Sequence, residues 1–105
     1  MILAIDFDNT IMDTKHPVEG QKMGPPMPDA LESLMDLHDA GHTLIIHTTR
    51  ANNPSGRKSV ADWLEYYDVD YDSIMPKPAA DFYIDDRAVE FQDWEDTLVE
   101  IGFEN

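Results

Sequence analysis

Reactive side chains follow four apolar segments of this chain. They are Asp6 and Asp8 after the first segment, Thr48 after the second, Lys77 after the third, and Asp85 with Asp86 after the fourth. One carboxylate of an Asp-x-Asp pair can attack phosphorus to form an aspartyl-phosphate while the other transfers protons. A hydroxyl and an ammonium group can hold the phosphoryl oxygens. These residue types therefore favour phosphoryl transfer.

A cluster of carboxylates also predicts a metal ion. The carboxylates would repel each other and an anionic substrate, so a cation is needed to offset their charge. Mg²⁺ suits a site made of oxygen ligands, because it takes one or two carboxylates and keeps several waters. The absence of cysteine excludes a disulfide framework, a thiolate nucleophile and a zinc-thiolate site. We therefore expect Mg²⁺ as the cofactor.

The four apolar segments have the length and composition of buried strands. The expected strands cover residues 2–7, 43–47, 73–75 and 81–84. Residues 12–27 mix charged residues, prolines and glycines without periodicity, which predicts a loop or small flap. Prolines on both sides of Lys77 hold the chain extended there, so this lysine is expected to be fixed in position.

Two amphipathic helices are expected between the strands. The first opens at Pro28 and Asp29 and ends at Gly41, and the second carries apolar residues at helical spacing from Val60 to Tyr67. A short helix or turn is expected around residues 89–94, and the tail from 97 to 103 fits more than one structure.

Strands that alternate with helices predict an α/β fold. We expect one domain, residues 1–105, with a Rossmann-like three-layer α/β/α sandwich built on a parallel sheet of about four strands. No connection is long enough for a cap domain. Ligands of such sheets bind beyond the carboxyl ends of the strands, so the reactive side chains are expected to meet at one edge.

The charge of the chain restricts its partners. With 22 acidic and 7 basic residues, the formal charge of −15 repels polyanions, which disfavours long nucleic acids. The N-terminal apolar run is interrupted by Asp6 and lacks a basic flank, so it is neither a signal peptide nor a membrane span. A cytoplasmic protein is expected, with no membrane association.

Four motifs, in order, resemble those of the haloacid dehalogenase superfamily. The first is Asp6-Phe7-Asp8-Asn9-Thr10-Ile11, the second lies at the end of Leu44-Ile45-Ile46-His47-Thr48-Thr49-Arg50, the third is Lys77, and the fourth is Tyr83-Ile84-Asp85-Asp86-Arg87. The resemblance spans about residues 1 to 90 and implies a minimal, capless phosphatase. It also implies a phosphomonoester substrate and hydrolysis through an aspartyl-phosphate.

The resemblance assigns roles to individual residues. Asp6 would be the nucleophile and Asp8 the general acid and then the general base. Thr48 and Lys77 would hold the phosphoryl group, with Thr49 as a competitor for the role of Thr48. Further implied roles are substrate contact or surface pairing for Arg50, metal ligation by Asp6, the Asp8 carbonyl and Asp86, and a water-mediated metal contact for Asp85, with the last two open to reversal.

Other functions remain open at this point. Receiver domains also combine an acidic pair, a phosphorylated aspartate, a threonine and a lysine, but in a different order along the chain. A non-catalytic domain that binds phosphate or metal is a further alternative. Fold and core motif do not set the substrate, and the oligomeric state is not fixed by the sequence. Specificity would come from residues 12–27, the loop after Thr48 or a neighbouring subunit.

Overall fold

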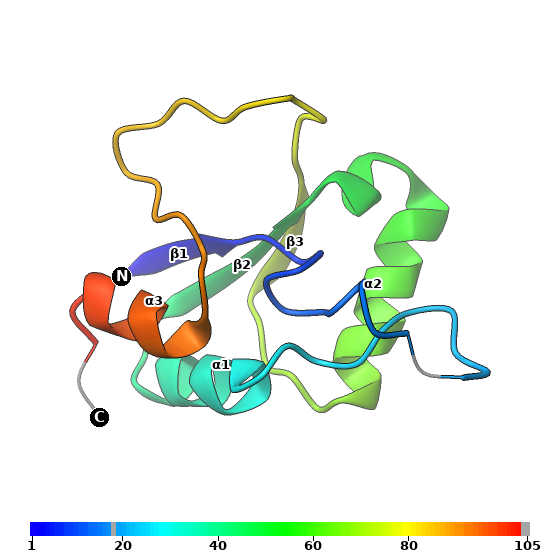
Figure 1. Ribbon diagram of the computed structural model, residues 1–105, viewed down its shortest axis with the longest axis horizontal. Coiled ribbons are helices and arrows are strands. Elements are labelled where there is room, and N and C mark those ends of the chain that lie inside the picture. The colour runs from blue at the N-terminus through cyan, green and yellow to red at the C-terminus, as the bar shows by residue number, and fades with distance from the viewer. Residues whose placement is uncertain (18, 104–105) are drawn as a thin grey trace.

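The computed structural model describes residues 1–17 and 19–103 of the chain. Its elements are β1 (Ile2–Ile5), α1 (Ala30–Asp39), β2 (Thr43–Thr48), the 3₁₀ helix η1 (Thr49–Asn52), α2 (Pro54–Tyr66), β3 (Ser73–Pro76) and α3 (Trp94–Glu100). The strands form one parallel sheet in the order β1-β2-β3 (Figure 1). The predicted α/β fold with a parallel sheet is therefore confirmed.

One face of the sheet forms the core. Along β2 the side chains of Leu44, Ile46 and Thr48 are buried, whereas the alternate residues are only partly buried. Successive strand residues point to opposite faces, so this alternation marks one inner and one outer face. On the inner face, α1 contributes Leu34 and Leu37 to the same buried cluster.

The helices gather on the inner face of the sheet (Figure 1). Right-handed crossovers explain this, because β1, β2 and β3 follow one another in a single direction and α1 and α2 must then lie on the same side. The outer face is exposed at Ile2 and Met75, which are 74% and 48% accessible. Helices on both faces, and with them a three-layer sandwich, are therefore not confirmed in the described residues.

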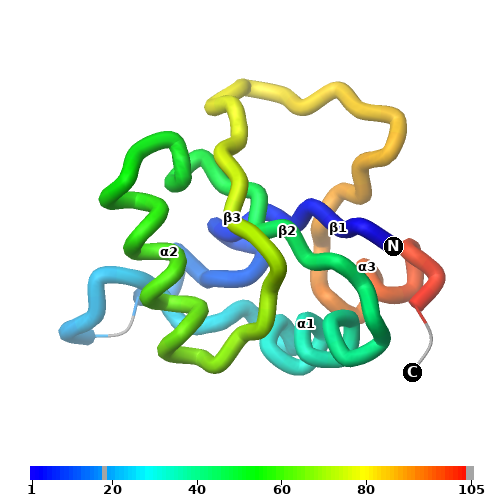
Figure 2. Tube along the Cα trace, turned by 180° about the vertical axis from the view of Figure 1, so that it is seen from behind, coloured from blue at the N-terminus to red at the C-terminus, as the bar shows by residue number. Residues whose placement is uncertain are grey.

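The expected fourth strand is absent from residues 81–84. Residues 79–92, here called the strap, leave β3 and arch over to α3 without regular structure (Figures 1 and 2). Phe82 and Ile84 are 84% and 98% accessible, so they lack the burial that would hold a strand in place. The Tyr83 hydroxyl donates a hydrogen bond to the Pro78 carbonyl, which ties the start of the strap to the residues that follow β3. Within the described residues β1 pairs with β2 alone.

The loop expected at residues 12–27 is anchored rather than free where the structure describes it; Val18 lies outside the described residues. Met12 is buried and bridges to both Asp8 and Pro26. The indole Nε1 of Trp63 in α2 donates to the Gly24 carbonyl at 2.9 Å. The loop therefore packs beside the end of β1. In the parts of the chain that are described, none of the helices has the length and apolar character needed to cross a bilayer.

Gly24 sits where a side chain cannot be accommodated. A Cβ atom there would lie 1.6 Å from the Asp13 carbonyl oxygen, which is backbone and cannot rotate away. We expect Gly24→Ala to lower the free energy of unfolding by about 1–3 kcal/mol through overpacking. The control is Gln21→Ala, at an exposed position of the same loop, which should stay within about 0.5 kcal/mol of the wild type in urea unfolding. Equal stability of the two variants would contradict the tight contact.

Candidate active site

The ends of the three strands bring Asp6, Thr48 and Lys77 to one edge of the sheet. Ile5 pairs with Ile46, so Asp6 and Thr48 follow closely on neighbouring strands. Thr48 in turn pairs with Pro76, the residue before Lys77. The parallel register is thus the reason why residues far apart in sequence converge. The sequence predicted that four segments would meet at this edge, and the register brings the first three together.

Lys77 is held beside Asp6 by several contacts. Its Nζ lies 3.7 Å from Asp6 Oδ1, and its side chain is only 16% exposed. The same ammonium sits 4.2 Å from the ring centroid of Tyr83, a cation-π contact. The carbonyl of Lys77 accepts a hydrogen bond from the Asn52 side chain at 3.0 Å. Lys77 is therefore fixed in position, as its flanking prolines indicated.

Burial raises the pKa of the Asp6 carboxyl above its ordinary value. The Lys77 ammonium and the backbone N–H of Phe7 both favour the ionised form, but their effect is smaller than the loss of hydration. Asp8, two residues away, adds to the upward shift by repulsion. Asp6 is thus a partly desolvated carboxylate with a cation nearby, and such a group is a stronger nucleophile than one surrounded by water.

Asp8 is paired with Arg50 through both of its carboxylate oxygens. Arg50 Nε donates to Oδ1 at 2.7 Å, and the terminal NH2 nitrogen donates to Oδ2 at 2.9 Å. These hydrogen bonds raise the pKa of the Arg50 guanidinium. The sequence left two roles open for Arg50, contact with a substrate or pairing with a carboxylate. In the structure Arg50 pairs with Asp8.

A tight turn after β1 sets the positions of the two aspartates. The carbonyl of Phe7 accepts hydrogen bonds from the N–H groups of Thr10, Ile11 and Met12. Asn9 adopts a left-handed φ of 58°, which asparagine tolerates better than most residues. Its Oδ1 accepts from Thr14 N and Oγ1 at 3.0 and 2.8 Å. Asn9 had no role predicted from the sequence, although an asparagine at a strand end is a signal for such a turn.

The hydroxyl of Thr48 faces into the loop that follows β2. Thr48 is 1% exposed, and its Oγ1 accepts the backbone N–H of Arg50 at 3.2 Å. Its own hydroxyl hydrogen is left for another acceptor. Thr49 is exposed and begins η1. Of the two threonines, Thr48 is the buried one, and it remains the predicted phosphoryl ligand.

The four predicted metal ligands do not converge. Asp6 and Asp8 lie at the strand ends, while Asp85 and Asp86 are exposed on the strap. Over the described residues, there is no group of three or more acidic or histidine side chains that could hold a metal ion. Asp85 accepts a hydrogen bond from the Arg87 N–H at 2.8 Å and so closes a local turn. The separation has a physical cause, since the strand that would carry this pair to the sheet is absent.

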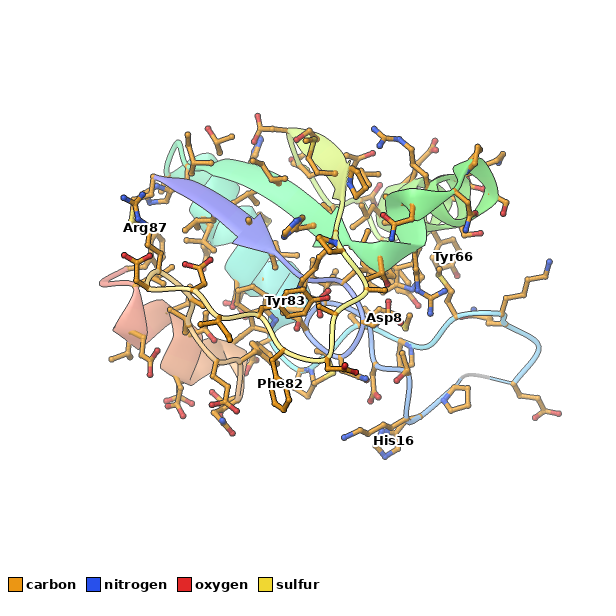
Figure 3. All side chains as sticks on the ribbon, turned by 90° about the horizontal axis from the view of Figure 1, so that it is seen from above. Asp8, His16, Tyr66, Phe82, Tyr83 and Arg87 are labelled. Atoms are coloured by element: carbon orange, nitrogen blue, oxygen red, sulfur yellow. The ribbon has the colours of Figure 1, made fainter. Side chains whose placement is uncertain are left out.

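A cavity of about 440 Å³ separates the strap from the free edge of β1. Asp6, Lys77, Tyr83 and Asp85 all line it, and apolar residues such as Trp94 line its inner wall. Tyr83 points back toward the strand ends, whereas Phe82 points away from the sheet (Figure 3). Asp85 therefore faces the same space as Asp6, although the strap holds it apart.

The pKa of Asp6 gives a test of this geometry. Because the folded chain binds a proton at Asp6 more tightly than the unfolded chain does, stability should fall as the pH rises from the ordinary aspartate range through the raised pKa. Asp6→Asn removes that cost and is expected to raise the melting temperature at pH 7 in the presence of EDTA.

Asp13 serves as the control of opposite sign. A hydrogen bond from His16 lowers the pKa of Asp13, so its contribution is present above its ordinary pKa and is lost as the pH falls through the lowered value. Asp13→Asn should therefore lower the melting temperature at pH 7. If Asp6→Asn were less stable than the wild type at that pH, the desolvation of Asp6 would be ruled out.

Comparison with known proteins identifies two solved structures with the same fold. One is the crystal structure of a protein from Vibrio cholerae. Its sequence is 30% identical to this one and its TM-score is 0.64, and the match covers 84% of this chain and 81% of that chain. The structure of a conserved protein from Bacteroides thetaiotaomicron is 25% identical, with a TM-score of 0.67, over 96% of this chain and 90% of that chain. No family model matches the sequence, and no curated protein matches it either.

These matches extend over most of this chain and most of each matched chain. Identity of 30% over more than four-fifths of each chain indicates common descent rather than a shared architecture alone. The chain therefore belongs to the same family as the Vibrio cholerae protein.

Proposed function

We propose that this chain is a phosphomonoester hydrolase that forms an aspartyl-phosphate on Asp6. The observation that carries the proposal is the half-exposed carboxylate of Asp6 at a strand end, with the Lys77 ammonium 3.7 Å away and the buried Thr48 on the neighbouring strand. A nucleophile with a fixed cation beside it, and a hydroxyl on the neighbouring strand, is suited to phosphoryl transfer. The resemblance of the four sequence motifs to haloacid dehalogenase phosphatases supports the same reaction.

The reaction would proceed in two steps. An oxygen of Asp6 attacks phosphorus, and the bond from phosphorus to the ester oxygen breaks while Asp8 gives that oxygen a proton. Water then attacks the aspartyl-phosphate, and Asp8 takes a proton from the water, so that phosphate leaves and Asp6 is restored. Thr48 and Lys77 would hold the phosphoryl oxygens, and Thr49 and Arg50 would add substrate contacts.

Small phosphorylated molecules are the substrate class that the chain favours. A charge of −15 opposes the approach of long polyanions. The cavity beside Asp6 and Lys77 offers about 440 Å³, within the usual range for a small-molecule site. We also propose a cytoplasmic location, because a chain without cysteine shows no adaptation to an oxidising compartment.

Mg²⁺ is the cofactor that this proposal implies, and its role would be to offset the negative charge of the carboxylates and the substrate. As the residues stand, the fit is incomplete: Asp6 and Asp8 follow β1, but Asp85 and Asp86 are on the strap. A complete set of oxygen ligands requires the strap to approach β1.

Three observations support such an approach. β1 has an unpaired edge among the described residues, a cavity adjoins that edge, and Phe82 and Ile84 on the strap are apolar and exposed. Pairing of residues 81–84 with β1 would bury these side chains and supply the expected fourth strand. It would also carry Asp85 and Asp86 to the carboxyl ends of the strands, where Asp6 lies.

Hydrolysis of 4-nitrophenyl phosphate tests the reaction. We expect turnover that depends on Mg²⁺, loss of turnover in Asp6→Asn, and a decrease of about 10²–10⁴-fold in Asp8→Asn. Lys77→Met should lower kcat by about 10²–10³-fold, because a donor to the phosphoryl oxygens is lost. Lys58→Met is the control, since Lys58 pairs with Asp62 on the surface of α2 at 2.7 Å.

Absence of turnover in a folded wild-type protein would contradict the proposal. Stable phosphorylation by a small acyl phosphate in the same sample would then favour a receiver-like domain.

Mg²⁺ binding in the absence of substrate tests the strap. Isothermal titration calorimetry should show weaker Mg²⁺ binding for Asp85→Asn or Asp86→Asn than for the wild type, by about tenfold or more for the direct ligand. The control is Asp81→Asn, which changes the first residue of the expected strand. Its affinity for Mg²⁺ should equal that of the wild type. Hydrogen exchange of residues 81–84 should slow when Mg²⁺ is added. Unchanged binding in both variants would exclude the acidic pair as ligands.

A further inference from the structure

We propose that Arg50 exchanges partners at the site: it binds the Asp8 carboxylate while no phosphoryl group is present, and it transfers to the phosphoryl oxygens when a substrate binds. The transfer would leave the Asp8 side chain free to face the leaving-group oxygen. This inference rests on the proposed phosphatase function and adds a positioning role that the sequence motifs do not assign.

The two aspartates differ in how strongly their oxygens are engaged. The guanidinium of Arg50 takes both oxygens of Asp8, at 2.7 and 2.9 Å. Asp6 has its nearest cation at 3.7 Å from one oxygen, which is longer than a hydrogen bond. Asp6 is thus open to an incoming group, whereas both oxygens of Asp8 are already engaged by a bidentate partner.

The backbone of Arg50 is fixed, so the exchange involves its side chain alone. Its N–H donates to Thr48 Oγ1 at 3.2 Å. Its carbonyl is packed so closely against Gly56 that a Cβ atom there would lie 2.1 Å from the carbonyl oxygen. The side chain is 35% exposed, which leaves it room to rotate. The Arg50 side chain can therefore rotate while its backbone stays in place, two residues after Thr48.

A phosphoryl group can compete with Asp8 for this side chain. The planar fork of a guanidinium matches a carboxylate and a phosphate equally well, and the phosphoryl group of a monoester carries the larger charge. Asp8 and Arg50 are both about two-thirds buried in their side chains, so the contact between them is partly shielded from water. Exchange of one anion for another keeps the guanidinium paired throughout, so no unpaired positive charge is left on Arg50.

The exchange can be observed directly by NMR. The chain has three arginines, so the Nε–Hε signal of Arg50 can be assigned by its loss in Arg50→Lys. Inorganic phosphate is titrated into the wild-type protein, with and without Mg²⁺, while this signal and the amide of Thr48 are followed. We expect both to shift with the same dissociation constant. In Asp8→Asn the Arg50 signal should start away from its wild-type position, and phosphate should still move it.

The outcomes separate this inference from the proposed function. If Thr48 shifts but the Arg50 signal stays in place at saturation, the phosphoryl site stands and the exchange is refuted. If neither responds, both the phosphoryl site and the exchange are refuted. Asp62→Asn, which breaks the surface ion pair with Lys58, is the control and should leave the titration unchanged.

A kinetic measurement distinguishes the exchange from a purely structural contact. Arg50→Lys keeps the charge but loses the fork, so kcat/KM for 4-nitrophenyl phosphate should fall by about 10- to 100-fold. The melting temperature should stay near that of the wild type, because the replaced contact is partly exposed. A wild-type kcat/KM in this variant would contradict a role in phosphoryl binding.

Discussion

The parallel pairing of β2 with both of its neighbours is the constraint on which the site depends. Register between Ile5 and Ile46 and between Thr48 and Pro76 decides which residues emerge beside one another. A slip of one residue would turn every side chain to the other face. The buried residues of β2 prevent such a slip, because Leu44 and Ile46 must face the helices. The core therefore specifies the positions of the reactive groups at the strand ends.

Charge is the second theme of this molecule. The chain has few cations, yet two of them lie at the site, one beside Asp6 and one on Asp8. Lys77 is held by contacts to an aromatic ring and a neighbouring amide, and Arg50 is held by its backbone. Positive charge is thus fixed where an anion would arrive, in a protein whose overall field opposes anions. Under the proposed function, this contrast would favour small phosphorylated compounds over long polyanions.

Much of this arrangement could be predicted from the sequence. Apolar runs with β-branched residues located β1, β2 and β3, and the rule that ligands meet the carboxyl ends of parallel strands grouped Asp6 with Thr48 and Lys77. The strap could not be predicted in this way. Residues 81–84 have the composition of a strand, but a strand exists only when it pairs, and pairing depends on tertiary contacts that local sequence does not encode. The same limit hid the contact between Arg50 and Asp8, since side-chain partners forty residues apart leave no local pattern.

The uncovered face and free edge of the sheet also affect how this protein behaves in concentrated solution. Among the described residues one edge of β1 is unpaired, and together with exposed apolar side chains such as Ile2 and Ile84 it invites pairing between copies of the chain. Mutual repulsion from a charge of −15 keeps such copies apart. Salt screens that repulsion at separations beyond about 10 Å at 0.1 M ionic strength. The acidity of the chain thus opposes self-association, and the strength of this repulsion depends on the ionic strength of the surrounding medium.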